Sequence, residues 1–413
     1  MKVLVSAMAC DPCGGSEGGV GWAAVNRIAL KHDVRVLVHA HSKSSWDSAR
    51  SRGLVRENVR VRFLGLDEKW NSNRLIARAQ SWQRFLAFNR EVLGAAMSWH
   101  EEEPCDVVHQ VTYATWRVPS PLWRMPVPFV WGPIGGVATI PKPFMGMLSL
   151  EARIMEFVRA AQTRFTKNSS AFLECVSNSS VVLAANEETE VFLRKYRGEK
   201  PMYRLPVAYL PPEKVVRFSR TANTSSSISG PLRLFAGGNI EGRKGVSLAL
   251  QALALVKRAG VEFVYTVAGG GPEIAKLQAL SKSLGIENEV IFHRGFRGDA
   301  YVEALHQSDI YFLPSFRETT PVTLQEAVLA GCYPIVADAS AAGEMVRLVG
   351  GKAVAADEPN MMIAGLCAAI LEAAGDRESM RQSALEAARN VATKYSELNY
   401  DQVTEVAYSA ALS

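Results

Sequence analysis

The amino-acid sequence predicts two doubly wound α/β domains, and three observations lead to this prediction. Short runs rich in Val, Ile and Leu alternate with amphipathic helical patterns, which is typical of parallel sheets built from βαβ units. The alternation occurs in two series, separated by a Ser-rich segment at residues 221–231 that has the composition of a linker. The chain has 413 residues, 48% of them hydrophobic and 21% charged, which is typical of globular proteins and too apolar for a disordered chain.

Each series contains six candidate strands. In the first we expect strands at residues 2–7, 33–40, 59–66, 106–111, 128–132 and 180–185, with long helical stretches at 69–103 and 144–165. In the second we expect strands at residues 232–238, 262–270, 289–296, 309–315, 333–338 and 351–356. In open α/β sheets, ligands bind at the carboxyl ends of the strands, so the loops that follow these strands are the candidate sites.

The charge and the apolar runs exclude some classes of protein. The net charge is +5, and the positive excess lies in residues 1–215. This half is not basic enough for a dedicated nucleic-acid binder, but it suits an anionic membrane surface or a phosphorylated substrate. No run approaches the ~18 apolar residues that span a bilayer, so an integral membrane protein is excluded. The opening MKVLVSAMAC is interpreted as a buried strand rather than a lipoprotein signal.

The six cysteines give little sign of a metal or redox site. Cys10 and Cys13 form a C-x-x-C pair, but a structural zinc site would need a second pair, which the sequence lacks. The other four lie singly in apolar stretches, as is usual in a reduced cytosolic protein. We therefore expect a cytoplasmic protein without a structural metal.

A glycine-rich loop that includes Gly14, Gly15 and Ser16 follows the first strand and precedes a helix. Glycines let a ligand approach the backbone, and a helix N-terminus attracts a phosphate. The loop also matches G-x-S-x-G, but a hydrolase nucleophile belongs on a later strand, and the dinucleotide motif G-x-G-x-x-G is not matched cleanly. A tight turn without a ligand stays open as the alternative.

Two glycine loops of the second series repeat this strand-to-helix arrangement. One carries Gly238 and Asn239, followed by the adjacent cations Arg243 and Lys244, which suit a diphosphate group at a helix N-terminus. A solvated basic turn is the alternative. The other loop contains Gly271, followed by a proline suited to the first position of a helix.

The segment at residues 314–327 carries two carboxylates. Glu318 lies in a loop at the carboxyl end of a strand, and Glu326 lies further on, in a helix that Pro321 can start. Carboxylates accept hydrogen bonds from hydroxyls, so two of them beside a cationic pocket suit the two polyol ends of a nucleotide-sugar. The alternative for Glu326, a solvated helix residue, is less favoured because A-V-L-A-G follows it.

These motifs resemble those of the retaining GT-B glycosyltransferases of family 4. The resemblance rests on E-x7-E at Glu318 and Glu326, and on the runs A-G-G-N-I-E-G-R-K-G, A-G-G-G-P and S-D-I-Y-F-L-P-S. It is most specific over residues 232–347 and loose over 40–210. It implies two Rossmann-like domains that face a cleft: an N-terminal acceptor-side domain at 1–210, a linker at 211–231, a nucleotide-sugar domain at 232–385, and a C-terminal helix at 386–413 that packs back on the first domain.

The resemblance also implies roles for individual residues. Glu318 would contact donor-sugar hydroxyls, Glu326 the nucleotide ribose and Lys244 the diphosphate, while Arg243 would replace the cation that the family has where Asn239 stands. Further donor contacts are implied at Gly15, Gly238, Asn239, Gly271, Thr320, Val322 and Thr323. Acceptor-side contacts are implied at Gly14, Ser16 and His109.

The expected function is sugar transfer, with retention, from a nucleotide-sugar to a glycan or lipid-linked hydroxyl acceptor in cell-surface polysaccharide assembly. The alternatives are a nucleotide-sugar epimerase on the same fold and an inactive nucleotide-sugar binder. No Asp-x-Asp motif occurs, so we expect no metal or other cofactor. Nucleic acid is not an expected partner.

The helical stretch at 69–103 suggests a peripheral membrane contact at the inner face of the cell membrane. It holds aromatic residues among arginines, a composition found in interfacial helices. These residues are Trp70, Trp82, Phe85, Leu86, Phe88 and Trp99, with Arg74, Arg78, Arg84 and Arg90. Packing of the same stripe on the chain's own sheet is the alternative.

Overall fold

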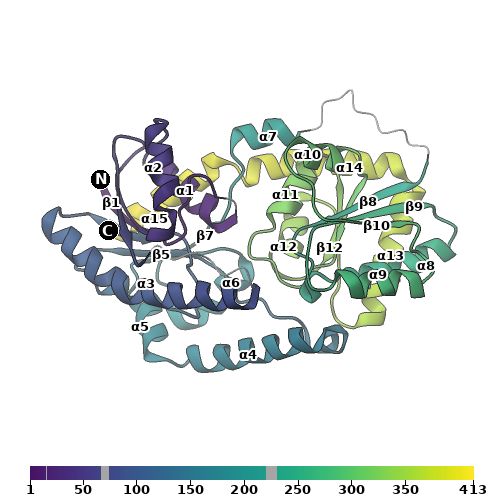
Figure 1. Ribbon diagram of the computed structural model, residues 1–413, viewed down its shortest axis with the longest axis horizontal. Helices are drawn as coiled ribbons and strands as arrows, with labels where there is room; N and C mark the ends of the chain where they lie inside the picture. Colours follow the sequence, from purple (N-terminus) through teal and green to yellow (C-terminus); the bar gives the residue numbers. More distant parts are fainter. Residues whose placement is uncertain (15, 67–73, 220–229) are drawn as a thin grey trace. The chain divides into compact units, whose positions relative to one another are not determined.

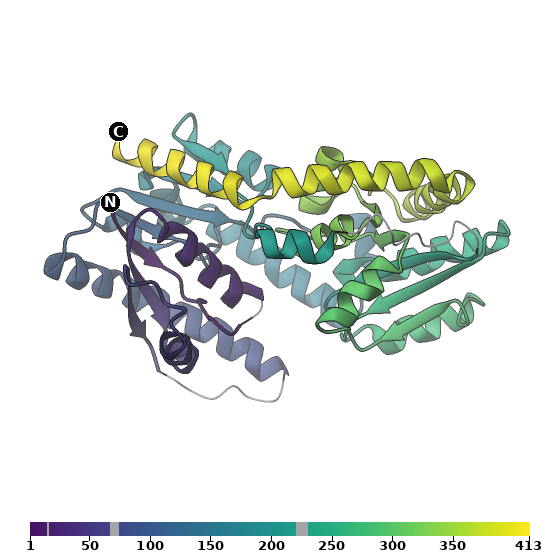
Figure 2. The same cartoon turned by 90° about the horizontal axis from the view of Figure 1, so that it is seen from above.

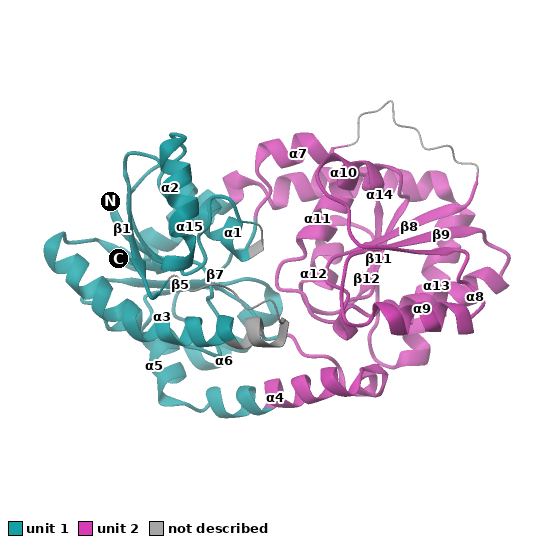
Figure 3. Ribbon diagram, viewed as in Figure 1, with its two compact units in different colours: residues 1–137, 161–208, 400–413 teal, residues 138–160, 209–399 magenta. Residues whose placement is uncertain are grey.

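The computed structural model describes residues 1–14, 16–66, 74–219 and 230–413, and the chain divides into two compact units. The first unit comprises residues 1–137, 161–208 and 400–413, and the second comprises 138–160 and 209–399 (Figure 3). Each unit is a parallel sheet covered by helices, as Figure 1 shows. The predicted fold class is therefore confirmed.

The first unit has a seven-stranded sheet in the order β3-β2-β1-β4-β5-β6-β7. Its strands are β1 (Lys2–Ser6), β2 (Asp33–His39), β3 (Val59–Leu64), β4 (Val107–Gln110), β5 (Phe129–Ile134), β6 (Val181–Ala184) and β7 (Met202–Arg204). Its helices are α1 (Ser16–Ile28), α2 (Lys43–Ser51), α3 (Arg74–Glu102), α5 (Ser170–Asn178) and α6 (Glu187–Arg197), with short 3-10 turns η1 (Ala40–Ser42) and η2 (Pro121–Arg124). The central strands are buried on both faces, which is why they are almost continuously apolar in sequence.

The second unit has a six-stranded sheet in the order β10-β9-β8-β11-β12-β13. Its strands are β8 (Leu232–Gly237), β9 (Phe263–Ala268), β10 (Val290–His293), β11 (Ile310–Leu313), β12 (Tyr333–Ala337) and β13 (Lys352–Val354). Its helices are α7 (Pro212–Phe218), α8 (Val246–Arg258), α9 (Ile274–Ser283), α10 (Asp299–His306), α11 (Val322–Leu329), α12 (Ser340–Val349), α13 (Pro359–Gly375) and α14 (Arg377–Lys394), with 3-10 turns η3 (Lys142–Met147) and η4 (Gly242–Lys244).

The unit boundaries differ from the predicted domain boundaries. Residues 138–160, which include the first part of α4 (Leu150–Thr166), belong to the second unit rather than to a continuous 1–210 domain. They are attached there by packing, since the Phe144 and Phe316 rings lie 4.6 Å apart. The predicted boundary at 385–386 falls inside α14, and α7 lies within the predicted linker, of which residues 220–229 are outside the described residues.

The described chain ends after α15 (Glu397–Leu412), the yellow helix beside the C mark in Figure 2, and residues 400–413 belong to the first unit. Asp401 pairs with Arg27 of α1, and His32 Nε2 lies 2.9 Å from Glu405. The Tyr408 hydroxyl lies 2.8 Å from Nδ1 of His109 on β4. These polar contacts join the end of the chain to the first unit.

The aromatic stripe of α3 packs into the core of the first unit, so its interpretation as a membrane face is wrong. Phe85, Phe88 and Trp99 are all at least 96% buried, and Arg84 is buried as well. Trp82 remains exposed, whereas Trp70 and the side chains of Arg74 and Arg78 lie outside what the structure describes. The stripe is apolar because it covers the sheet. No described helix is long and apolar enough to cross a bilayer.

Candidate functional site

Three loops at the carboxyl ends of β8, β9 and β11 meet in the second unit because glycines let their backbones touch. A Cβ atom at Gly271 would lie 2.0 Å from the Ile240 carbonyl oxygen, so the loops after β8 and β9 fit only with glycine there. Gly245 has a φ of +67°, and a Cβ atom there would lie 2.1 Å from the Pro314 oxygen. This contact brings Lys244 beside the loop that carries Glu318.

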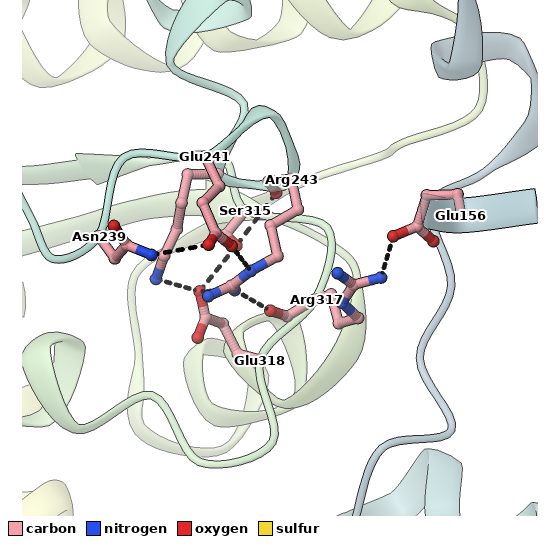
Figure 4. A network of polar contacts seen from close by, with 8 residues as sticks. Glu156, Asn239, Glu241, Arg243, Ser315, Arg317 and Glu318 are labelled. Carbon is pink, nitrogen blue, oxygen red and sulfur yellow. Dashed lines mark hydrogen bonds and ion pairs between the residues drawn. The ribbon is translucent and has the colours of Figure 1, made fainter. Parts of the chain in front are cut away.

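Glu318 lies at the centre of a polar network in these loops (Figure 4), where it forms an ion pair with Lys244. Lys244 Nζ donates to Oε1 of Glu318 at 2.6 Å, and the Ser315 hydroxyl donates to the same oxygen at 2.7 Å. The side chains of Lys244 and Glu318 are only 7% and 14% exposed, so the ion pair is largely shielded from solvent. A shielded pair of this kind holds both groups in fixed positions.

Arg243 and Asn239 are joined to this network through Glu241. One carboxylate oxygen of Glu241 accepts from Asn239 at 2.7 Å, and the other accepts from Nε of Arg243 at 2.9 Å. Arg243 also donates to the carbonyl oxygen of Arg317 at 2.7 Å and lies 3.5 Å from Glu318. The arginine therefore adds a second positive charge beside Glu318, while Asn239 adds none.

Glu326 lies in a separate cluster on α11. Its Oε1 accepts from Lys214 of α7 at 2.8 Å, and its Oε2 accepts from the Tyr301 hydroxyl at 3.2 Å. Burial, together with the negative charge of Glu326, raises the pKa of Tyr301 well above its usual value. Tyr301 therefore remains a neutral donor, and Glu326 is held from two sides rather than being solvated.

Tyr311, on β11, feels the charges of both carboxylates. Burial is the main cause that raises the pKa of its hydroxyl, and the charges of Glu318 and Glu326 both add to the rise. Its oxygen lies 2.9 Å from the Thr323 hydroxyl, in the first turn of α11. Thr320 and Val322 are half-buried where that helix begins, close in sequence to Glu318. Gly238, at a φ of +119°, borders Lys244, since a Cβ atom there would lie 3.7 Å from Nζ.

Of the predicted acceptor-side residues, Gly14 and His109 lie in described parts of the first unit, whereas the side chain of Ser16 does not. Gly15, which was predicted as a donor contact, also lies outside what the structure describes. A Cβ atom at Gly14 would lie 2.8 Å from the Asp11 side chain. His109 is completely buried in β4, with Nε2 2.8 Å from the Gly132 oxygen and Nδ1 2.8 Å from the Tyr408 hydroxyl. Its assignment as an acceptor contact is therefore wrong, because it is a strand histidine inside the core.

His109 gives the first unit a pH-dependent stability. Burial lowers its pKa from 6.5 to about 4. The folded histidine therefore stays neutral while the unfolded one takes up a proton as the pH falls below 6.5, so stability that is present above pH 6.5 is lost between pH 6.5 and 4. We expect the free energy of unfolding to fall by about 3 kcal/mol over this range because of His109. His109→Gln, measured by urea unfolding across the same range, should lack this component. Equal slopes for the two proteins would contradict the assignment.

Several polar residues of the site were not predicted from the sequence. Ser315 orients Glu318, and the Glu318 backbone N–H donates to the Ser340 hydroxyl at 2.9 Å. Lys214 and Tyr301 hold Glu326 from elements far away in sequence. Only Ser315 had a signal, its place in the P-S pair before the loop. Ser340 has a φ of +51°, a backbone conformation that cannot be predicted from the residue type alone.

The C-x-x-C pair has no metal-site geometry. Cys10 is a buried free thiol whose pKa is raised by burial, and Cys13 is an exposed free thiol. Within the described ranges, no group of three or more His, Cys, Asp or Glu side chains is placed to hold a metal ion.

The loops that carry Lys244 and Glu318 fall inside a segment that matches a known family. Residues 222–389 match the model of the glycosyl transferases group 1 family. This group 1 segment contains every residue of the Glu318 network except Glu156, which pairs with Arg317 from α4.

Curated relatives align with only part of the chain. A putative colanic acid biosynthesis glycosyltransferase of Salmonella typhimurium is 32% identical over 147 residues, which are 32% of this chain and 36% of the relative. A 2-deoxystreptamine glucosyltransferase of Streptomyces kanamyceticus is 32% identical over 102 residues, 25% of this chain and 26% of the relative. The chain thus spans about a third or less of the length of these relatives.

Solved structures show the fold over the whole chain. Sucrose-phosphate synthase of Thermosynechococcus elongatus has a TM-score of 0.65 at 14% identity and covers 99% of both chains. HepE of Anabaena, solved in complex with UDP, has a TM-score of 0.65 at 15% identity and covers 99% of this chain and 100% of HepE. A glycosyltransferase of lipopolysaccharide biosynthesis, WaaG, has a TM-score of 0.59 at 16% identity, with 98% and 99% covered. The chain therefore has the GT-B glycosyltransferase fold.

Proposed function

We propose that this chain transfers a sugar, with retention, from a nucleotide-sugar donor to a hydroxyl acceptor on a glycan or a lipid-linked carrier. The observation that carries the proposal is the shielded Lys244–Glu318 pair at the carboxyl ends of β8 and β11, inside the group 1 segment. The relatives named for colanic acid biosynthesis and, in Erwinia amylovora, for amylovoran biosynthesis support a role in polysaccharide assembly.

The network gives Lys244 and Arg243 a role in the transition state. Negative charge builds up on the nucleoside diphosphate as its bond to the sugar breaks, and cations held in place beforehand stabilise that charge. Lys244 is fixed by Glu318, and Arg243 by Glu241 and the Arg317 carbonyl. Neither cation has to reorganise far when the leaving group forms.

Donor binding would also change the partners of Glu318. In the unliganded pair, Oε1 of Glu318 accepts from both Lys244 and Ser315. When Lys244 pairs with the diphosphate instead of with Glu318, the Glu318 carboxylate becomes free to accept hydrogen bonds from sugar hydroxyls. Glu326, held by Lys214 and Tyr301, would keep lone pairs for the two hydroxyls of the ribose.

The proposal is tested by following both products of the reaction. The chain is incubated with UDP-, GDP- and ADP-sugars and a panel of glycan and lipid-phosphate acceptors, and nucleotide release and the sugar product are measured. Transfer is expected with one donor class, with the anomeric configuration kept. An epimerised free sugar would show the epimerase instead, and donor binding without any turnover would show the inactive binder.

Transfer should not require a divalent metal. The positive charges beside Glu318 are Lys244 and Arg243, and the chain has no Asp-x-Asp motif to bind a metal–diphosphate complex. We therefore expect less than about a twofold change in the initial rate when EDTA replaces Mg²⁺ or Mn²⁺, because the cationic side chains already neutralise the leaving group. A rate that falls to background with EDTA and returns with Mn²⁺ would contradict this.

A further inference from the structure

Helix α4 presents an exposed apolar face. Four large apolar side chains lie along it at spacings of four, three and eight residues, which places them on one side of a helix. Leu150 is 73% exposed, Ile154 55%, Phe157 79% and Phe165 76%, and Val158 on the same side is 46% exposed. No residue of α4 is buried, in contrast to α3, whose aromatic residues fill the core. This set of five residues is called the α4 apolar face.

The opposite side of α4 is attached to the protein. Glu156 forms an ion pair with Arg317 (Figure 4), and Ala152 packs against the core of the second unit. The helix is therefore anchored by one side, while the α4 apolar face is exposed and not covered by the parts of the chain that the structure describes. Contiguous exposed apolar surfaces of this kind mark sites of interaction.

Basic side chains border the α4 apolar face. Arg153 and Arg164 are exposed and lie along one edge of it, Arg153 three residues after Leu150 and Arg164 directly before Phe165. Arg153 donates to the backbone carbonyls of Gly146 and Leu148. Because these acceptors are uncharged, they do not neutralise the positive charge of Arg153. Glu151 is an exposed acid near the opposite edge, and Glu156 is used by Arg317.

We propose that α4 is a membrane-surface helix that inserts the α4 apolar face into the interface of an anionic bilayer. A helix of 17 residues spans about 25 Å and lies in the plane of the interface rather than crossing the membrane. Its Phe and Ile side chains reach the acyl boundary, while Arg153 and Arg164 contact lipid phosphates. The basic border favours an anionic lipid surface over an uncharged apolar partner.

Because α4 is attached to the loop that carries Glu318, membrane binding by α4 would also position the candidate donor site. Glu156 pairs with Arg317, the residue before Glu318, and the Arg317 carbonyl accepts from Arg243. Docking of α4 therefore holds the Glu318 loop at a fixed depth near the bilayer, where a lipid-linked acceptor would be presented. This consequence rests on the proposed function, whereas the binding of vesicles does not.

The test is cosedimentation of the full chain with vesicles, which requires no donor or acceptor. We expect binding to vesicles of phosphatidylglycerol and phosphatidylcholine, and weak binding to phosphatidylcholine alone. Ile154→Glu with Phe157→Glu should lower the partition constant at least about tenfold, because two apolar anchors are lost. Arg153→Glu with Arg164→Glu should lower it by roughly fivefold or more for each residue.

Matched controls separate α4 from general changes in charge and apolar surface. Met361→Glu replaces an apolar residue of α13 that is 70% exposed, and Arg52→Glu with Arg56→Glu reverses two exposed arginines elsewhere. All variants are checked for folding by circular dichroism, and light scattering measures self-association. Wild-type chain that stays in the supernatant, α4 variants that bind like the wild type, or a wild-type dimer that the α4 variants abolish would each overturn the proposal.

Discussion

Replacing Glu318 by alanine is expected to abolish sugar transfer while the chain still folds and binds nucleotide. Glu318 is the acceptor for both Lys244 and Ser315, and in the proposed reaction it passes to the hydroxyls of the donor sugar. Loss of a charged acceptor costs about 1.5–3 kcal/mol, and Lys244 loses its positioning partner as well. We expect kcat, measured by nucleotide release at saturating donor, to fall more than about a hundredfold.

Glu326→Ala should behave differently. Glu326 is held by Lys214 and Tyr301, away from the ion pair, and is proposed to contact the ribose. We expect donor affinity to fall roughly tenfold or more with kcat largely retained. Glu386→Ala, an exposed acid on α14, is the matched control and should leave both parameters unchanged. Near-normal transfer by Glu318→Ala, or the reverse pattern for the two glutamates, would refute the assignment.

Lys244→Met is expected to weaken donor binding and to destabilise the second unit at the same time. The Lys244 side chain is only 7% exposed, and that of Glu318 is 14% exposed. Removal of the lysine charge therefore leaves the Glu318 carboxylate shielded from solvent without the cation that pairs with it. We expect a loss of about 1–3 kcal/mol in the free energy of unfolding, and a tenfold or greater rise in donor Kd.

A second substitution separates these two effects of Lys244→Met. Adding Glu318→Gln removes the unpaired charge, so the double variant should recover stability in urea unfolding without recovering donor binding or transfer. A single Lys244→Met variant with wild-type donor Kd would show that Lys244 does not bind the diphosphate. Recovery of transfer in the double variant would contradict the role of both residues.

The succession of strands along the chain could be predicted, and candidate residues could be selected in the loops after them, because both depend on local patterns. Each predicted strand segment overlaps an observed strand, since buried parallel strands are short apolar runs bounded by turns. The strand β5 extends two residues beyond its predicted segment at 128–132, and the three-residue β7 was missed. Lys244 and Glu318 were found because each follows a strand of the second series. Their direct contact at 2.6 Å was not foreseen, because it depends on the Gly245–Pro314 approach.

The environment of a side chain was much harder to predict. The stretches of α3 and α4 both show apolar residues at helical spacing among arginines, but Phe85 is 1% exposed and Phe157 is 79% exposed. Sequence periodicity reports that a face is apolar and not what covers it. For the same reason, the sequence did not reveal the surroundings of His109, whose ring contacts Tyr408, 299 positions away. The ion pair of Glu326 with Lys214 could not be predicted either, because the two residues are 112 positions apart in the sequence.

Calorimetric titration of the full chain with UDP-, GDP- and ADP-sugars tests the central claim, a nucleotide-sugar site built on Lys244 and Glu318, most directly. The expected result is saturable binding of one donor class at one site for the wild type, with affinity at least about tenfold lower for Lys244→Met and unchanged for Glu386→Ala. A folded wild-type chain that binds none of the donors, or a donor whose affinity is the same for Lys244→Met, would contradict the claim.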